Sequence, residues 1–188
     1  MSLQFAILTA LAERQSTGIE LTRRFDRSFG YFWTATHQQI YRELDRLSSC
    51  GWVEATTPPD RPGRGQPKRF AITTDGISAL QDWLHGIDEP APVRESIAIR
   101  LRAAAVVGDI AGVRAAVTRH LEVHEQNLAT YRDIDARDFS APETETDILR
   151  HLMLKQGLRS EQMWADWCRE VLSTIDRLPS RRDPSEPA

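Results

Sequence analysis

The sequence predicts a mainly α-helical protein made of two parts, and three observations support this prediction. Apolar residues recur at helical spacing over most of the 188 residues. Residues 52–73 interrupt this pattern with two short β-prone runs around a proline- and glycine-rich segment. After residue 108, two long helical patterns follow each other. We therefore expect a small domain at residues 1–86, a long-helix domain at residues 87–178 and a disordered tail at residues 179–188.

The composition is that of an ordinary globular protein. Hydrophobic residues make up 40% of the chain and charged residues 27%. No apolar run approaches the roughly 18 residues that a membrane span needs. The two cysteines, Cys50 and Cys168, lie far apart and lack the spacing of a metal site. We expect a cytoplasmic protein without a membrane segment, in which both thiols are reduced and pack as small apolar groups.

The positive charge is concentrated in one segment although the net charge is −3. The basic residues of this segment are Arg61, Arg64, Lys68 and Arg69. Only charges close to phosphates contribute to counterion release, so a local basic patch on a mildly acidic protein is compatible with DNA binding.

The first domain begins with two short amphipathic helices. Residues 3–13 form the first, with apolar residues Phe5, Ile7, Leu8 and Leu11. Thr17 can cap the second, which we expect over residues 18–28. Its expected core residues are Ile19, Leu21 and Phe25.

Residues 36–51 form the third and most informative helix. Thr36 and Gln39 have the spacing of a capping box, and Gly51 ends the helix where a positive φ is needed. Its buried stripe consists of Ile40, Leu44 and Leu47, and its exposed first turns carry His37, Gln38, Tyr41 and Arg42. Such groups suit insertion into a DNA major groove. The alternative is an ordinary amphipathic surface helix.

A hairpin and a fourth helix complete the first domain. Residues 52–56 and 69–73 are β-prone, with Trp52, Phe70 and Ile72 expected to face inward. The Pro/Gly-rich basic segment between them should be an exposed loop, and a helix follows from residue 74 to about residue 85. Three helices, a hairpin with a basic loop and a further helix are the order of a winged helix-turn-helix, whose third helix enters the groove and whose loop is the wing.

Residues 5–84 resemble the PadR family of transcriptional regulators. The motifs that carry this resemblance are Ile40-Tyr41-x-x-Leu44-x-x-Leu47, Gly51-Trp52-Val53-Glu54 and Arg69-Phe70 with the ending Thr73-x-x-Gly76. Two residues depart from the family pattern. Ile19 replaces a tyrosine that usually follows the glycine, and Arg42 replaces a proline that commonly follows the tyrosine. Arg42 adds a cationic donor where the helix would meet DNA.

The second half contains long helices with single apolar stripes. We expect helices over residues 93–107, from a cap at Asp109 to about residue 135, and over residues 142–178. The stripe of the last helix includes Leu149, Leu152, Trp164, Cys168, Val171, Ile175 and Leu178. Such helices need a partner surface, and a second copy of the chain is the simplest one. In PadR-like and virulence-activator-like proteins the C-terminal helical domain is similarly the dimerisation module.

The expected DNA contacts come from the third helix and the wing. Gln38 and His37 are placed nearest the base edges. The other expected contact residues are Thr36, Tyr41 and Arg42 at the backbone or adjoining bases, and Arg64, Gln66 and Lys68 on the wing side. A homodimer would place two such helices about 34 Å apart and read a palindromic operator.

Two further groups of residues have both a packing interpretation and a functional one. Trp164 and Trp167 could line a pocket for a small aromatic or hydrophobic effector, or pack in the core or interface. His120 and His124 have a spacing that permits a shared metal ion, but the HExxH motif is absent and packing is the simpler interpretation.

We find no Gly-rich phosphate loop and no supported catalytic grouping, and we expect neither enzyme activity nor a cofactor or metal. Two hypotheses remain. The first is a dimeric, sequence-specific DNA-binding transcriptional regulator, expected to be a repressor that responds to a small molecule. The second is a winged-helix adaptor that binds other proteins through the same surface.

Overall fold

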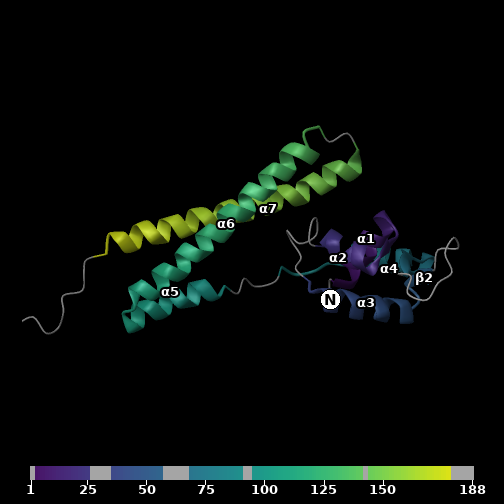
Figure 1. Cartoon of the computed structure of the whole chain (residues 1–188), viewed down its shortest axis with the longest axis horizontal. Coiled ribbons are helices and arrows are strands. Elements are labelled where there is room, and N and C mark those ends of the chain that lie inside the picture. Colours follow the sequence, from purple (N-terminus) through teal and green to yellow (C-terminus); the bar gives the residue numbers. More distant parts are fainter. Residues whose placement is uncertain (1–2, 26–34, 57–67, 91–94, 142–143, 179–188) are drawn as a thin grey trace, which may run out of the picture. The chain divides into compact units, whose positions relative to one another are not determined.

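The computed structural model describes residues 3–25, 35–56, 68–90, 95–141 and 144–178. The chain divides into two compact units, Met1–Pro90 and Ala91–Ala188, each with its own apolar core (Figure 1).

Among the described residues, the first unit contains four helices and a three-stranded antiparallel sheet. Its elements are α1 (Leu3–Glu13), β1 (Ser16–Thr17), α2 (Gly18–Arg24), α3 (His37–Ser49), β2 (Val53–Thr56), β3 (Arg69–Ile72) and α4 (Thr74–Leu84). The strand order is β1-β3-β2. The predicted winged helix-turn-helix is confirmed. The sequence does not predict β1, because two residues are too few to show an alternating pattern.

The apolar stripes of the helices meet in the core of the first unit. Leu8 of α1, Leu21 of α2 and Leu44 of α3 are fully buried. Trp83 of α4 stacks on Phe5 of α1 with their ring centroids 4.5 Å apart. Each fully buried leucine contributes roughly 1.5–3 kcal/mol relative to an exposed one, so this cluster holds α3 firmly against α1 and α2.

The prediction of Ile19 as a core residue of α2 is wrong. Ile19 is 52% exposed, and Thr22 is buried instead. Residues 18, 21, 22 and 25 share one face of the helix, and residue 19 lies outside that face. Thr22 can be buried because its Oγ1 donates a hydrogen bond to the Ile19 carbonyl at 2.9 Å. The predicted end of this helix near residue 28 lies outside the described residues.

The two hairpin strands are each one residue shorter than predicted, because Trp52 and Thr73 lie at junctions with helices. The Thr73 N–H donates to the Trp52 carbonyl at 3.0 Å, and the Thr73 side chain caps α4. The apolar hairpin residues that pack in or against the core are Trp52, Val53, Phe70, Ala71 and Ile72. Val53 and Ala71 are the buried ones, and the three residues predicted to face inward are half-buried.

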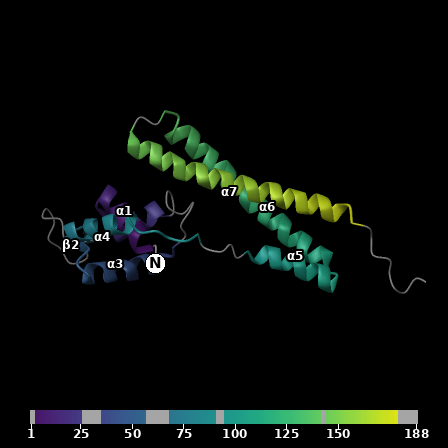
Figure 2. The same ribbon diagram turned by 180° about the vertical axis from the view of Figure 1, so that it is seen from behind.

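The described part of the second unit consists of α5 (Ser96–Val107), α6 (Ile110–Asp138) and α7 (Glu145–Asp176). Helices α6 and α7 lie side by side (Figures 1 and 2). They are antiparallel, since His124 of α6 contacts Glu161 of α7 and Asp135 contacts His151, each at 2.6 Å. Between α5 and α6, Gly108 has a φ of 80°, and Asp109 caps α6 as predicted. The predicted start of the first of these helices at residue 93 lies outside the described residues.

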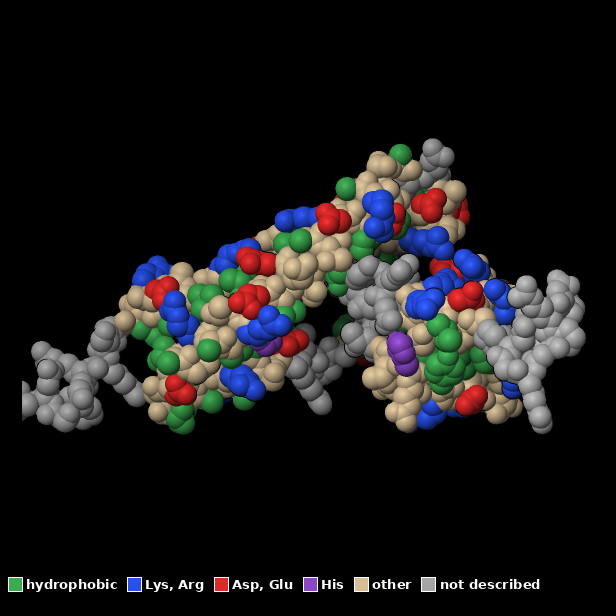
Figure 3. Space-filling model, viewed as in Figure 1, with side chains coloured by type: hydrophobic (Ala, Val, Ile, Leu, Met, Phe, Trp, Pro, Cys, Tyr) green, Lys and Arg blue, Asp and Glu red, His purple; other side chains and the backbone are tan. Residues whose placement is uncertain are grey.

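Several apolar residues of the last predicted stripe are not covered within one chain. Leu149 and Leu152 are 64% and 55% exposed, while Leu154 and Gly157 of the same helix are buried. Figure 3 shows apolar side chains exposed between interspersed acidic and basic ones over this unit. Within the described ranges, none of the helices has the length and apolarity required to cross a bilayer.

Candidate functional site

The first turns of α3 present a group of exposed polar side chains. The Thr36 Oγ1 accepts a hydrogen bond from the Gln39 N–H at 3.2 Å, and the Gln39 Oε1 accepts one from the Thr36 N–H at 2.8 Å. The predicted capping box is therefore confirmed. The exposed residues at this end of α3 are Thr36, His37, Gln38, Tyr41 and Arg42. We call these residues the α3 tip.

The opposite face of α3 fixes how this tip is presented. Ile40, Leu44 and Leu47 are fully buried. The helix ends at Cys50 and Gly51, and Gly51 has a φ of 77°, as its predicted role at the helix end requires. A tip that is carried by a rigid, well-packed helix keeps its side chains in a defined geometry.

Tyr41 contacts α2 although its side chain is partly exposed. A Cβ atom on Gly18 would lie 2.4 Å from Tyr41 Cε1, so the ring occupies the space that any side chain at residue 18 would need. Tyr41 therefore sets the spacing of α2 and α3 in addition to lying on the exposed face. The sequence contains the motif but not this contact, because Gly18 and Tyr41 lie in different helices.

Strand β1 links the α3 tip to the base of the hairpin. Thr17, which precedes Gly18, pairs with Arg69 of β3. Lys68, which precedes Arg69, is exposed. The tip and the hairpin base therefore belong to directly connected elements of one packed unit. Outside the described residues lie the other predicted loop residues, Arg61, Arg64 and Gln66.

Arg69 connects these elements through an ion pair and a hydrogen bond. Its charge is therefore already paired and does not add a free cation to the predicted basic patch. Its Nη2 lies 3.5 Å from Glu20 Oε1, and its Nη1 donates to the Gln15 carbonyl at 3.4 Å. The Thr17 backbone N–H donates to Glu20 Oε2 at 2.8 Å. This hydrogen bond, with a further contribution from Arg69, lowers the pKa of Glu20. Arg42, by contrast, forms no ion pair within the described residues.

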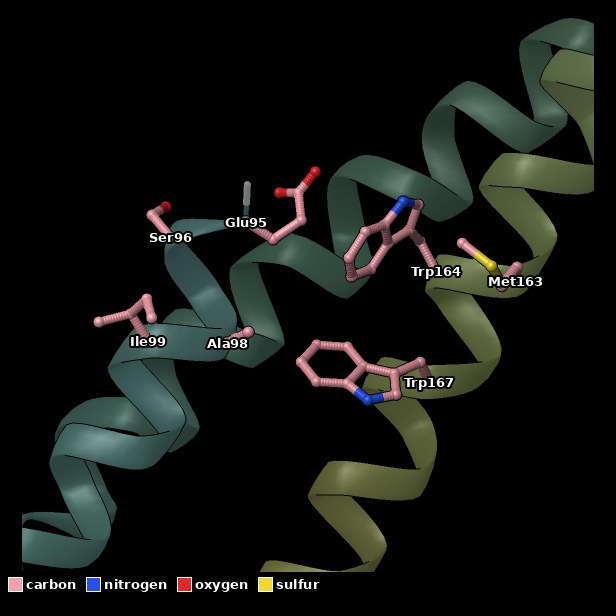
Figure 4. A pocket seen from close by; sticks show the side chains of 7 residues that line it. All are labelled: Glu95, Ser96, Ala98, Ile99, Met163, Trp164 and Trp167. Atoms are coloured by element: carbon pink, nitrogen blue, oxygen red, sulfur yellow. The ribbon is translucent and has the colours of Figure 1, made fainter. Parts of the chain in front are cut away.

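A second candidate site is a hollow of about 750 Å³ between α5 and α7 (Figure 4). The N-terminal end of α5 contributes Glu95, Ser96, Ala98 and Ile99, and α7 contributes Met163, Trp164 and Trp167. Figure 4 shows both indole rings projecting from α7 toward α5. The two tryptophans with alternative ligand-binding and packing interpretations line this hollow, and both also pack against the core of the second unit. Among the described residues, Glu95 is the one ionisable side chain that lines this hollow.

Contacts within the second unit hold the two indole rings at a right angle. The ring centroids of Trp164 and Trp167 are 5.5 Å apart, with an angle of 88° between the planes. Trp164 stacks on the ring of His124 at 5.8 Å, and Glu161 Oε2 lies 2.6 Å from His124 Nδ1. The ring of Trp164 is thus fixed from α6 while it lines the hollow.

The remaining candidates from the sequence are the pair His120 and His124 and the buried Cys168. The rings of His120 and His124 lie 6.1 Å apart, and His124 is already engaged by Glu161. Over the described ranges, no three His, Cys, Asp or Glu side chains are grouped as metal ligands. Cys168 is buried, which raises the pKa of its thiol, so it packs as an apolar group as predicted. The same prediction is wrong for Cys50, which is exposed at the end of α3.

Two protein-family models match the chain, one in each unit. The model described as "Transcriptional regulator PadR-like family" matches residues 7–82. The model described as "Virulence activator alpha C-term" matches residues 93–176.

Individual relatives are similar over almost the whole chain. The probable transcriptional regulator Rv1176c of Mycobacterium tuberculosis is 40% identical, and the match covers 93% of this chain and 98% of the relative. Among solved structures, the virulence activator AphA of Vibrio cholerae is 31% identical with a TM-score of 0.76, covering 93% of this chain and 98% of its own. PadR of Bacillus subtilis in complex with operator DNA is 25% identical with a TM-score of 0.77, covering 94% and 100%.

The Bacillus subtilis protein is named a negative transcriptional regulator. Its structure in complex with p-coumaric acid is 24% identical to this chain, with a TM-score of 0.73 and coverage of 94% of this chain and 100% of its own. The similarity to this p-coumaric acid complex shows that the two chains share a fold.

Proposed function

The chain belongs to the PadR-like family of transcriptional regulators, and on this basis we propose that it is a cytoplasmic homodimer that binds a specific operator. We further propose that it acts as a repressor and responds to a small molecule. The observation that carries the proposal is the exposed polar α3 tip, which Gly18 and β1 connect to the base of the basic hairpin. The operator complex of the Bacillus subtilis relative supports this assignment.

The α3 tip is proposed to read bases and the hairpin to hold phosphates. Gln38 can donate to and accept from the major-groove edge of adenine, and His37 lies beside it at the start of the helix. The residues assigned to the DNA backbone or adjoining bases are Thr36, Tyr41 and Arg42, and those assigned to wing-side phosphates are Arg64, Gln66 and Lys68. Phosphate contacts set the register of the protein, while base contacts give its specificity.

The exposed apolar residues of α7 support the homodimer. Ile148, Leu149, Leu152 and Met153 are between 43% and 64% exposed. They lie at spacings that place them on neighbouring positions of one helix face. Apolar stripes of this kind are covered by a second helix in paired helices. Two copies related by a twofold axis would present two α3 tips to the two halves of a palindrome.

The hollow between α5 and α7 supports the proposed effector site. It is lined mainly by apolar and aromatic side chains with one carboxylate, as small-molecule sites commonly are. The complex of the Bacillus subtilis relative with p-coumaric acid and the name of that relative as a negative regulator support an effector-responsive repressor. A bound effector would shift the dimer between states with different separations of the two α3 tips.

Selection of bound duplexes from a random pool, with the full-length chain, tests this proposal. We expect a palindrome whose half-sites are about 10 base pairs apart from centre to centre. Gln38→Ala should change the base preference at one position in each half-site. Arg64→Ala combined with Lys68→Ala should weaken all duplexes alike and reduce the salt slope by about 2.

The adaptor hypothesis predicts the opposite results. If no motif emerges and neither variant changes duplex binding or its salt dependence, the result favours the adaptor hypothesis, in which the α3 tip and hairpin bind another protein. The proposed function as a DNA-binding regulator would then be wrong.

A further inference from the structure

We propose that the exposed face of α2 forms a second DNA contact, in which Ile19 packs against the C5-methyl group of a thymine and Arg23 binds a neighbouring phosphate. Neither residue belongs to the α3 tip or to the hairpin. This inference rests on the proposed function and deepens it, because it adds one residue that selects a base and one that holds the DNA backbone.

Ile19 lies at the edge of the α3 tip, next to Tyr41. Among the described residues of α2 and α3, these two are the large apolar side chains that remain exposed, at 52% and 41%. Gly18 lies against the ring of Tyr41, and successive Cα atoms are only about 3.8 Å apart, so Ile19 starts beside that ring. An apolar surface therefore adjoins the polar groups that are proposed to read bases.

The place of α2 in the fold brings this apolar side chain to the border of the major groove. In a helix-turn-helix the first helix crosses the DNA backbone while the second enters the groove, and here these two helices are α2 and α3. The apolar group that base pairs display in the major groove is the C5-methyl of thymine. The side chain of Ile19 has no hydrogen-bond donor or acceptor, so burial against that methyl group is the contact by which it favours one base.

The first turn of α2 holds Ile19 in a defined position. The Thr17 Oγ1 accepts a hydrogen bond from the Glu20 N–H at 3.2 Å, and the Glu20 Oε2 accepts one from the Thr17 N–H at 2.8 Å. The Thr22 Oγ1 donates to the Ile19 carbonyl at 2.9 Å. Because these hydrogen bonds fix the backbone around Ile19, little conformational freedom is lost when this residue meets DNA.

Arg23 lies one turn further along the same face of α2. Residues four apart are neighbours on a helix surface, and Arg23 is exposed like Ile19. Within the part of the chain that the structure describes, Arg23 forms no ion pair. The adjacent Arg24 instead contacts Glu13 at 2.6 Å and donates to the Ala10 carbonyl at 2.6 Å. The guanidinium of Arg23 is therefore available for a phosphate, which arginine binds through paired N–H donors.

Replacing thymine by deoxyuridine tests the base contact, because it removes only the methyl group. The duplex selected by the full-length chain is prepared in versions that each carry deoxyuridine at one thymine of one half-site. At one of these positions we expect the wild type to lose about fourfold in affinity, the effect of one buried methyl group. At that position Ile19→Ser should bind both duplexes equally, and Ile19→Val should keep the preference for thymine.

A matched control is Ile77→Ser, which removes an exposed isoleucine from α4 and should leave the preference for thymine unchanged. Arg23→Gln should weaken the binding of every duplex alike and lower the salt slope by about 1, while it keeps the preference for thymine. Because Ile19 and Arg23 are both exposed, the thermal unfolding midpoints of their variants should stay close to that of the wild type.

Binding of the unmodified selected duplex by the wild type separates this inference from the proposed function. If the wild type binds that duplex but no thymine shows a methyl effect that Ile19→Ser removes, the base contact of α2 is refuted and the proposed function stands. An unchanged salt slope for Arg23→Gln refutes the phosphate contact in the same way. A wild type that selects no duplex refutes the proposed function, and the α2 contact with it.

Discussion

A Cβ atom on Gly18 would lie 2.4 Å from Cε1 and 2.7 Å from Oη of Tyr41. Gly18 is the first residue of α2, and Tyr41 lies about one turn into α3. The tyrosine ring therefore occupies the space between α2 and α3, and α3 carries the proposed DNA-reading residues. The identity of residue 18 controls how closely α3 approaches α2.

Gly18→Ala should destabilise the protein by forcing the Tyr41 ring aside. Overpacking of this kind costs about 1–3 kcal/mol. In a Tyr41→Ala background the same substitution should cost nothing or stabilise by about 0.4–1 kcal/mol, because alanine restricts the unfolded chain. A double-mutant cycle measures this difference from the free energies of unfolding of the wild type, the two single variants and the double variant. An equal cost in both backgrounds would show that the ring is not the cause.

Of the two contacts proposed for Arg42, the DNA backbone or adjoining bases, the backbone contact predicts that Arg42→Ala weakens binding to every duplex and lowers the salt slope by about 1. Arg46→Ala on the same helix is the matched control. Arg46 is paired with Glu43 at 2.6 Å, and the hydrogen bond from this pair raises the pKa of Arg46. Affinity as a function of salt should change for Arg42→Ala only. Equal slopes for the wild type and Arg42→Ala would contradict the backbone contact.

Gly76→Ala should be among the most damaging substitutions in the first unit. A Cβ atom there would lie 2.2 Å from the Trp52 backbone oxygen and 2.8 Å from Ile72 Cγ1, and a backbone oxygen cannot swing away as a side chain can. We expect a loss of about 3 kcal/mol or more in urea denaturation. Gly112→Ala is the control, because its Cβ would meet only the movable carboxylate of Asp109. Similar losses for both variants would contradict this explanation.

The sequence predicts what depends on local spacing. The capping box at Thr36, the helix end at Gly51 and the winged helix-turn-helix order all follow from residues close together in the chain, and all are confirmed. Prediction from the sequence fails where the structure depends on a contact between residues that are far apart in the chain. Ile19 looks apolar enough for the core, but the face of α2 that packs inward is occupied by Leu21 and Thr22.

The candidate sites show the same division. The exposed residues of α3 are identifiable from the buried stripe alone. The role of Arg69 in holding Glu20, and the placement of Glu95 opposite Trp164 and Trp167, depend on which elements meet in space. Neither pairing has a sequence spacing that could reveal it.

Glu20 should contribute to stability in a pH-dependent way. The hydrogen bond from the Thr17 N–H and the proximity of Arg69 lower the pKa of Glu20 below its ordinary 4.5. The folded state thus favours the charged carboxylate, so its stabilisation is present above about pH 4.5 and is lost as the pH falls further. Glu20→Gln keeps an acceptor for the capping box but cannot titrate.

Unfolding free energies between about pH 5 and pH 3 test this. The stability of Glu20→Gln should fall less steeply with acid than that of the wild type. Glu54→Gln, which removes an exposed carboxylate from β2, serves as the control and should follow the wild-type curve. Parallel curves for Glu20→Gln and the wild type would show that Glu20 is not held in its charged form.

The number of chains on one duplex tests most directly whether two α3 tips read a palindrome together. Sedimentation equilibrium of the full-length protein with the selected palindromic duplex, and with a duplex carrying one half-site, gives this number. We expect two chains on the palindrome and an affinity for the half-site that is lower by a factor of about 100 or more. One chain per duplex, with equal affinity for the palindrome and the half-site, would contradict the proposed dimeric reading of DNA.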